Sequence, residues 1–95
     1  MEKFIYIADD DDNIRNLLKS FLEREGYIVS AFPTGDDLLK KFTIDPCDLI
    51  ILDVMMPGRD GFFILKEISI LNRLCNSCQI LVYNSSGTHI QMTNL

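Results

Sequence analysis

Apolar residues fall into short continuous runs that alternate with segments of helical period. Runs bounded by polar or turn residues predict buried strands at residues 3–8, 27–32, 48–53 and 79–83. The third run, DLIILD, has no polar interruption, which is typical of the centre of a parallel sheet. Strands separated by helices predict an α/β domain, with right-handed crossovers that place helices on both faces of a parallel sheet.

The first helix is expected between the first two strands. Its apolar stripe is formed by Ile14, Leu17, Leu18, Phe21 and Leu22. Either Asp11 or Asp12 is the expected N-cap, because a short carboxylate side chain accepts hydrogen bonds from the first free amides of a helix. Gly26 lies where a helix C-cap is expected.

Two further helices follow the same logic. The second is expected over residues 36–42, after a Pro-Thr-Gly break in which Thr34 is the N-cap. The third is expected over residues 61–71. Its expected core contacts are Phe62, Leu65, Ile68 and either Leu71 or Asn72.

Aspartates follow the first and third expected strands. If these strands are neighbours in an open parallel sheet, Asp9, Asp10 and Asp53 converge at one edge. Carboxylates ~4 Å apart repel by roughly 1 kcal/mol in water, and by ~4 near a protein surface, unless a cation lies between them. Oxygen ligands with open water positions are typical of Mg²⁺. A second interpretation is helix capping, which explains Asp11 and Asp12 but not the other three aspartates.

Length, composition and net charge argue against several classes of function. A chain of 95 residues that is 47% hydrophobic is expected to form one domain with its own core. The formal net charge of −5 argues against nucleic-acid binding and against binding to an anionic membrane. No apolar segment reaches transmembrane length, and the first residues lack the apolar stretch of a secretory signal. We therefore expect a cytoplasmic protein.

The cysteines Cys47, Cys75 and Cys78 are expected to be structural. Their odd number argues against a disulfide framework. The CNSC motif supplies only two metal ligands. It also precedes a strand, whereas a redox pair is typical of a helix start.

Two segments carry a family resemblance: FIYIADDDDNIRNLLKSFLEREGYIVSAFPTGDDLLKKF and PCDLIILDVMMPGRDGFFILKEI. The most specific feature is DVMMPGRDG combined with the upstream ADDD. Together the segments resemble the receiver domain of bacterial two-component response regulators, especially receivers attached to winged-helix DNA-binding domains. The resemblance implies a flavodoxin-like, doubly wound sheet with strand order 2-1-3-4-5.

The resemblance also implies roles for individual residues. Asp53 would accept a phosphoryl group from a sensor histidine kinase. Asp10 would bind Mg²⁺ directly, Asp9 would act mainly through water, and the backbone carbonyl of Met55 would complete the protein's share of the ligands. Receivers also carry a Ser or Thr at the end of the fourth strand that contacts the phosphoryl group. Ser85 is the expected equivalent here, or Asn84 if the register is one residue shorter.

The chain departs from this family after about Ile70. The family needs a Lys after a fifth strand, and no Lys or Arg follows Arg73. We expect GTHIQMTNL to be too short for the remaining elements, which leaves order 2-1-3-4 with the fifth strand and last helices missing. Residues 1–95 would then be a single incomplete receiver domain, through truncation or an interrupted reading frame. The unpaired edge of the fourth strand would favour a homodimer or strand exchange.

The leading interpretation is a phosphoacceptor module of a His-Asp phosphorelay, not an enzyme, that regulates a missing DNA-binding output. Without that output this fragment is not expected to bind nucleic acid. We expect Mg²⁺ binding to survive and phosphorylation to be weakened. One alternative is a degenerate module that acts without phosphorylation. Another is a Mg²⁺-dependent aspartyl phosphohydrolase, which is disfavoured because its D-x-D motif would need Asp at position 55, where Met55 stands.

Overall fold

A computed structural model describes residues 2–54, 61–75, 78–83 and 90–93. Its strands are β1 (Phe4–Ala8), β2 (Ile28–Phe32), β3 (Leu49–Asp53), β4 (Gln79–Tyr83) and β5 (Ile90–Thr93). Its helices are α1 (Asp12–Arg24), α2 (Gly35–Ile44) and α3 (Gly61–Cys75). The strands form one sheet in the order β2-β1-β3-β4-β5. The expected α/β class and the order 2-1-3-4 of the parallel strands are confirmed.

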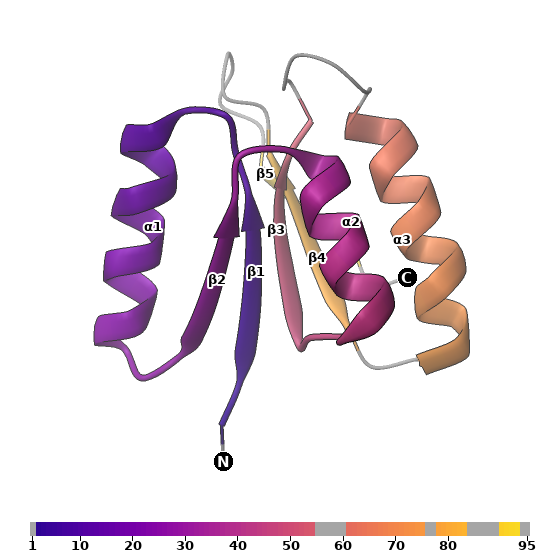
Figure 1. The fold of residues 1–95 in the computed structure, drawn as a ribbon, viewed down its shortest axis with the longest axis horizontal. Coiled ribbons are helices and arrows are strands. Elements are labelled where there is room, and N and C mark those ends of the chain that lie inside the picture. Colours follow the sequence, from indigo (N-terminus) through magenta and orange to yellow (C-terminus); the bar gives the residue numbers. More distant parts are fainter. Residues whose placement is uncertain (1, 55–60, 76–77, 84–89, 94–95) are drawn as a thin grey trace.

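The helices lie on both faces of the sheet (Figure 1). Helix α1 packs against β2 and β1, whereas α2 and α3 lie together on the opposite face. Helix α1 begins after Asp11, whose side chain accepts hydrogen bonds from the amides of Asn13 and Ile14. Gly26 follows its C-terminus with φ of 97°, a left-handed conformation that favours glycine. Thr34 caps α2 as expected, through the amide of Asp37.

The prediction that the fifth strand is missing is wrong. Residues Ile90–Thr93 form β5, which pairs antiparallel with β4 and places Ile90 opposite Tyr83. A short antiparallel strand needs only a tight return of the chain, whereas a parallel strand needs a crossover of a dozen or more residues. The edge of β4 is therefore paired, and the argument for strand exchange at that edge no longer holds. The homodimer stays a prediction, but an unpaired edge of β4 no longer supports it.

The larger core cluster lies between the sheet and helices α2 and α3. Its fully buried aliphatic and aromatic side chains include Leu38, Phe42, Ile50, Leu52, Ile64, Ile68 and Ile80. The expected contact by Phe62 is wrong, since this residue is 61% exposed. The buried face of α3 follows the four-residue spacing Ile64, Ile68, Asn72, with Leu65 and Leu71 partly buried beside it.

Helix α1 covers the other face more thinly. None of its residues is fully buried, and only Leu18 and Leu22 of the expected stripe pack against the smaller cluster of Ile5, Ile7, Val29 and Ile51. Leu17 and Phe21 remain 69% and 54% exposed. The apolar stripe of α1 is wider than the part of the sheet that the helix contacts. Leu17 and Phe21 therefore lie outside the contact with the sheet.

Two of the cysteines meet at the amino ends of β3 and β4. The Sγ atoms of Cys47 and Cys78 are 4.0 Å apart, and both residues are buried. The side chain of Asn72 holds the Cys78 backbone by donating to its carbonyl (2.8 Å) and accepting from its amide (3.2 Å). This packing agrees with the structural role expected for Cys47 and Cys78. The side chain of Cys75 lies outside the described residues.

Candidate metal centre

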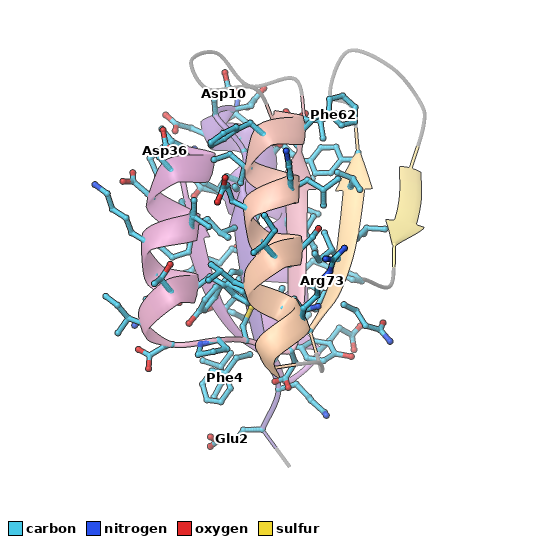
Figure 2. The ribbon with its side chains drawn as sticks, turned by 90° about the vertical axis from the view of Figure 1, so that its right-hand side faces the viewer. Glu2, Phe4, Asp10, Asp36, Phe62 and Arg73 are labelled. Atoms are coloured by element: carbon cyan, nitrogen blue, oxygen red, sulfur yellow. The ribbon has the colours of Figure 1, made fainter. Side chains whose placement is uncertain are left out.

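The acidic cluster lies at the carboxyl ends of β1 and β3, which are paired neighbours. Ala8 is opposite Leu52 in the parallel register, so Asp9 and Asp53 follow side by side. Figure 2 shows Asp10 at the same end of the molecule as Asp36, opposite Glu2 and Phe4. This is the edge at which strand order reverses around β1, where ligands bind in open α/β sheets.

The three carboxylates converge as the sequence predicted. Asp9, Asp10 and Asp53 each offer an oxygen, and these oxygens lie within 4.8 Å of one another. Asp9 and Asp53 are fully buried, whereas Asp10 is exposed. A set of carboxylate oxygens with one side open to water suits a hard divalent cation such as Mg²⁺. The geometry thus supports the metal interpretation and leaves capping to Asp11.

Because side chains alternate between the two faces along a strand, the buried aspartates are expected on the face of the sheet that α1 covers. In β3, Leu49 and Ile51 belong to the α1 side and Ile50 and Leu52 to the α2/α3 side. Because side chains repeat every second residue, Asp53 continues the α1 side. By the same rule Asp9 continues Ile5 and Ile7, and Tyr83 continues Leu81.

Asp9 is held by donors on both carboxylate oxygens. Its Oδ1 accepts from the backbone amide of Asp11 at 2.8 Å, and its Oδ2 accepts from the hydroxyl of Tyr83. Its backbone carbonyl accepts from Arg15 at 2.7 Å, and the Arg15 guanidinium also pairs with Asp12. The start of α1 therefore fixes Asp9 from one side, and β4 fixes it from the other.

The cluster crowds three carboxylates, of which Asp9 and Asp53 are buried and Asp10 is exposed. Burial raises the pKa of Asp9 above its ordinary value, and the charges of Asp53 and Asp10 raise it further. The hydrogen bonds from Tyr83 and the Asp11 amide partly oppose this rise in pKa. Burial also raises the pKa of Tyr83, and its hydrogen bond to Asp9 adds to the rise. A divalent cation would remove the repulsion that raises the pKa of Asp9.

Other predicted site residues cannot be placed. Met55, Ser85 and Asn84 lie outside the described residues. The described end of the fourth strand is Tyr83, which is opposite Asp53 in the register. The sequence pattern did not single out Tyr83, because its ring fits an apolar strand. The available signal was its place as the last residue of QILVY, at the carboxyl end of a strand, where the aspartates also lie.

The fold and the site define a class before any comparison: a doubly wound α/β domain with a carboxylate cluster, suited to a divalent cation, at the switch point of its sheet. The family model described as "Response regulator receiver domain" matches residues 5–94. The chain belongs to this family, and it is a receiver domain of two-component response regulators.

Relatives and solved structures agree with this assignment. The chain is 44% identical over 68 residues to the transcriptional regulatory protein CssR of Bacillus subtilis, covering 72% of this chain and 30% of CssR. It resembles the response regulator TrrA in its crystal structure with the histidine kinase ThkA, with a TM-score of 0.73, 34% identity, and coverage of 92% of this chain and 72% of the other. It also resembles TrrA of Thermotoga maritima in complex with Mg²⁺-BeF, with a TM-score of 0.72, 38% identity, and coverage of 84% and 65%. The chain spans only about 26–30% of the length of the curated relatives.

None of the helices among the described residues is long and apolar enough to span a membrane.

Proposed function

We propose that Asp53 accepts a phosphoryl group from a sensor histidine kinase, in a site that binds Mg²⁺. The observation that carries the proposal is the convergence of three carboxylate oxygens within 4.8 Å, with Asp53 and Asp9 fully buried. The likeness to TrrA, which was crystallised with a histidine kinase and with Mg²⁺-BeF, supports it. In this proposal Asp10 is a direct ligand, Asp9 acts through water, and the Met55 carbonyl contributes a further oxygen.

The proposed reaction needs little from the protein beyond positioning. A carboxylate oxygen of Asp53 forms the new bond to phosphorus, and the phosphorus–nitrogen bond of the donor phosphohistidine breaks. The imidazole of the donor leaves with the bonding electron pair and gains a proton. Bound Mg²⁺ would neutralise charge on the transferring phosphoryl oxygens. Asp53 is held for this role because β3 is paired on both sides, with β1 and β4.

The module is proposed to act in transcription regulation, in the cytoplasm, and without turnover as an enzyme. Residues 1–95 are proposed to form a single receiver domain, with the DNA-binding output outside this chain. Ser85 is proposed to contact the phosphoryl group.

Phosphorylation can be tested by mass spectrometry. The chain is incubated with Mg²⁺ and a small phosphodonor such as acetyl phosphate, and the expected product carries one phosphoryl group. Asp53→Ala is expected to abolish the product, and peptide mapping of the wild-type protein should place the group on residue 53. The matched control is Asp37→Asn, a change at an exposed carboxylate in the first turn of α2. Phosphorylation that persists in Asp53→Ala would contradict the proposal.

Metal binding is tested separately by isothermal titration calorimetry with Mg²⁺ alone. Asp10→Asn and Asp53→Asn are expected to weaken binding, and Asp37→Asn is expected to leave it unchanged. Equal binding by all four proteins would show that Mg²⁺ does not bind at this cluster.

A second candidate is a module that acts without phosphorylation. It is favoured by one observation: β5 runs antiparallel to β4, whereas the family resemblance implies a fifth strand that is followed by a Lys. Circular dichroism with Mg²⁺ and beryllofluoride separates the two candidates. A response that Asp53→Ala removes supports the phosphoacceptor, and the absence of any response supports the second candidate.

A further inference from the structure

We propose that Tyr83 is a positioning residue of the metal centre, whose hydroxyl holds the carboxylate of Asp9 in place for the cation. This inference rests on the proposed Mg²⁺ site and adds to it a residue from a third strand. Tyr83 acts through Asp9 and is not itself proposed as a ligand.

The position of Tyr83 is fixed by the backbone around Asp53. In the parallel register Tyr83 lies directly opposite Asp53, and the amide of Val54 donates to the Tyr83 carbonyl at 2.9 Å. The end of β4 therefore cannot shift relative to the end of β3 without breaking this ladder. Because of the two-residue alternation, the side chains of Tyr83, Asp53 and Asp9 share one face of the sheet.

The hydroxyl completes the hydrogen bonding of a buried anion. Asp9 is fully buried, and its carboxylate oxygens receive one donor each, from the Asp11 amide and from Tyr83. Rotation of this carboxylate would break one or both hydrogen bonds inside the protein, where their loss is costly. The two donors therefore fix the orientation of Asp9 before a cation arrives.

The ring of Tyr83 is held independently of its hydroxyl. It is half-buried and packs against the cluster that contains Ile5, Ile7 and Ile51. Removing only the hydroxyl, as in Tyr83→Phe, leaves this apolar packing and the strand register intact. The variant separates the positioning role from the packing role of the same side chain.

Groups that orient the carboxylates of a metal site have measurable effects on the affinity for the metal. Loss of such a hydrogen-bond partner typically weakens metal binding by about 10- to 100-fold. We expect Tyr83→Phe to raise the dissociation constant for Mg²⁺ about 10-fold, measured by isothermal titration calorimetry with MgCl₂. The matched control is Tyr27→Phe, which removes a hydroxyl from a 39% exposed tyrosine that adjoins β2 and is expected to leave the dissociation constant unchanged.

A spectroscopic signature reports the contact itself. The near-ultraviolet absorption of a tyrosine depends on the hydrogen bonding of its hydroxyl, so Mg²⁺ should produce a tyrosine difference spectrum in the wild-type protein. Tyr83→Phe should lose that spectrum, and Tyr27→Phe should keep it. The variant Tyr6→Phe/Tyr27→Phe leaves Tyr83 as the only tyrosine, since the chain has three, so that its signal can be followed even if Tyr83→Phe fails to fold.

The outcomes separate this inference from the proposed function. If wild-type protein binds Mg²⁺ and Tyr83→Phe binds it equally well, the positioning role is wrong and the metal centre stands. If Tyr83→Phe lowers the urea midpoint of unfolding and leaves the affinity for Mg²⁺ unchanged, the hydroxyl of Tyr83 only stabilises the fold and the inference is overturned. If the wild-type protein shows no saturable Mg²⁺ binding, both the metal centre and the role of Tyr83 are rejected.

Phosphorylation gives a further distinguishing readout. A positioning role predicts that Tyr83→Phe needs about 10-fold more Mg²⁺ for half-maximal phosphorylation and reaches the wild-type rate at saturating Mg²⁺. A rate that stays low at saturating Mg²⁺, with unchanged half-saturation, would contradict positioning through Asp9.

Discussion

The two faces of the sheet are built from alternate residues of the same strands, but they are covered to different degrees. On one face, α2 and α3 bury Leu38, Phe42, Ile64 and Ile68 almost completely. On the other, α1 buries none of its own residues fully and leaves Phe21 54% exposed. Two helices, α2 and α3, pack against each other and against one face, whereas among the described residues the other face is covered by α1, which contacts chiefly β2 and β1.

The candidate metal centre lies on the face that α1 covers. Asp9, Asp53 and Tyr83 follow, by the alternation of side chains along their strands, the residues that face α1. The opposite face packs mainly apolar side chains against α2 and α3. We infer that the α2/α3 face contributes most of the packing stability, whereas the α1 face carries the candidate metal centre.

The largest difference in the free energy of unfolding is expected between two variants, each of which replaces a phenylalanine by alanine. Phe42→Ala, on the filled face, is expected to lower the free energy of unfolding by about 3–5 kcal/mol, because it removes a ring that is only 2% exposed. Phe21→Ala, on α1, is expected to change it by no more than about 0.5 kcal/mol. Urea denaturation followed by circular dichroism measures both. Similar losses in the two variants would show that the two faces contribute equally to stability.

The next largest effect on stability is expected at a close contact between α2 and α3. A Cβ on Gly35 would lie 2.8 Å from Cγ1 of Ile64. Gly35→Ala is therefore expected to cost about 1–3 kcal/mol of stability, even though Ala favours helix by up to ~1 kcal/mol.

The double variant Gly35→Ala/Ile64→Ala isolates this contact. The added methyl group would enter space vacated by the isoleucine, so the double variant should be less destabilised than the sum of the single variants. Additive losses would show that the cost of the added methyl group does not arise from its contact with Ile64.

On the α1 face, removing charge should stabilise the metal-free protein. Asp53→Asn removes one of three converging carboxylates, and we expect a gain of ~1 kcal/mol in a chelating buffer, because repulsion falls. The same variant should gain less stability from added Mg²⁺ than the wild type, because stabilisation by a ligand that binds only the native state falls as its dissociation constant rises. Thermal unfolding with and without Mg²⁺ measures both effects, and Asp37→Asn is the control.

The smallest expected effect is on the pH dependence of stability. Burial holds the native pKa of Asp9 above its ordinary value of 3.8, so the native protein keeps this proton to a higher pH than the unfolded chain. The stabilising contribution is full below about pH 3.8 and is lost as pH rises through the raised native pKa. In chelating buffer, wild-type protein should lose more stability over this interval than Asp9→Asn. Equal slopes would contradict the shift in pKa.

Sequence patterns predicted most of the elements because each depends on local physics. The strand Gln79–Tyr83 was expected with these bounds, and Thr34 and Asp11 cap the helices through amides two or three residues away. The convergence of the aspartates also followed, since the ends of adjacent parallel strands meet at one edge. Phe62 was misassigned, because a helix with apolar residues on several faces does not reveal which face meets the sheet.

What the sequence patterns determined is therefore the α/β class and the aspartates that follow the first and third strands. These depend on period, capping and strand ends, which neighbours along the chain decide. The order of the four parallel strands was expected only from the family resemblance. Only the tertiary structure decided that Ile90–Thr93 pairs with β4, that α1 covers its face thinly, and that Tyr83 reaches Asp9. Tyr83 and Asp9 are 74 residues apart in the chain. No local pattern links two such residues, because their contact exists only after β1, β3 and β4 have paired.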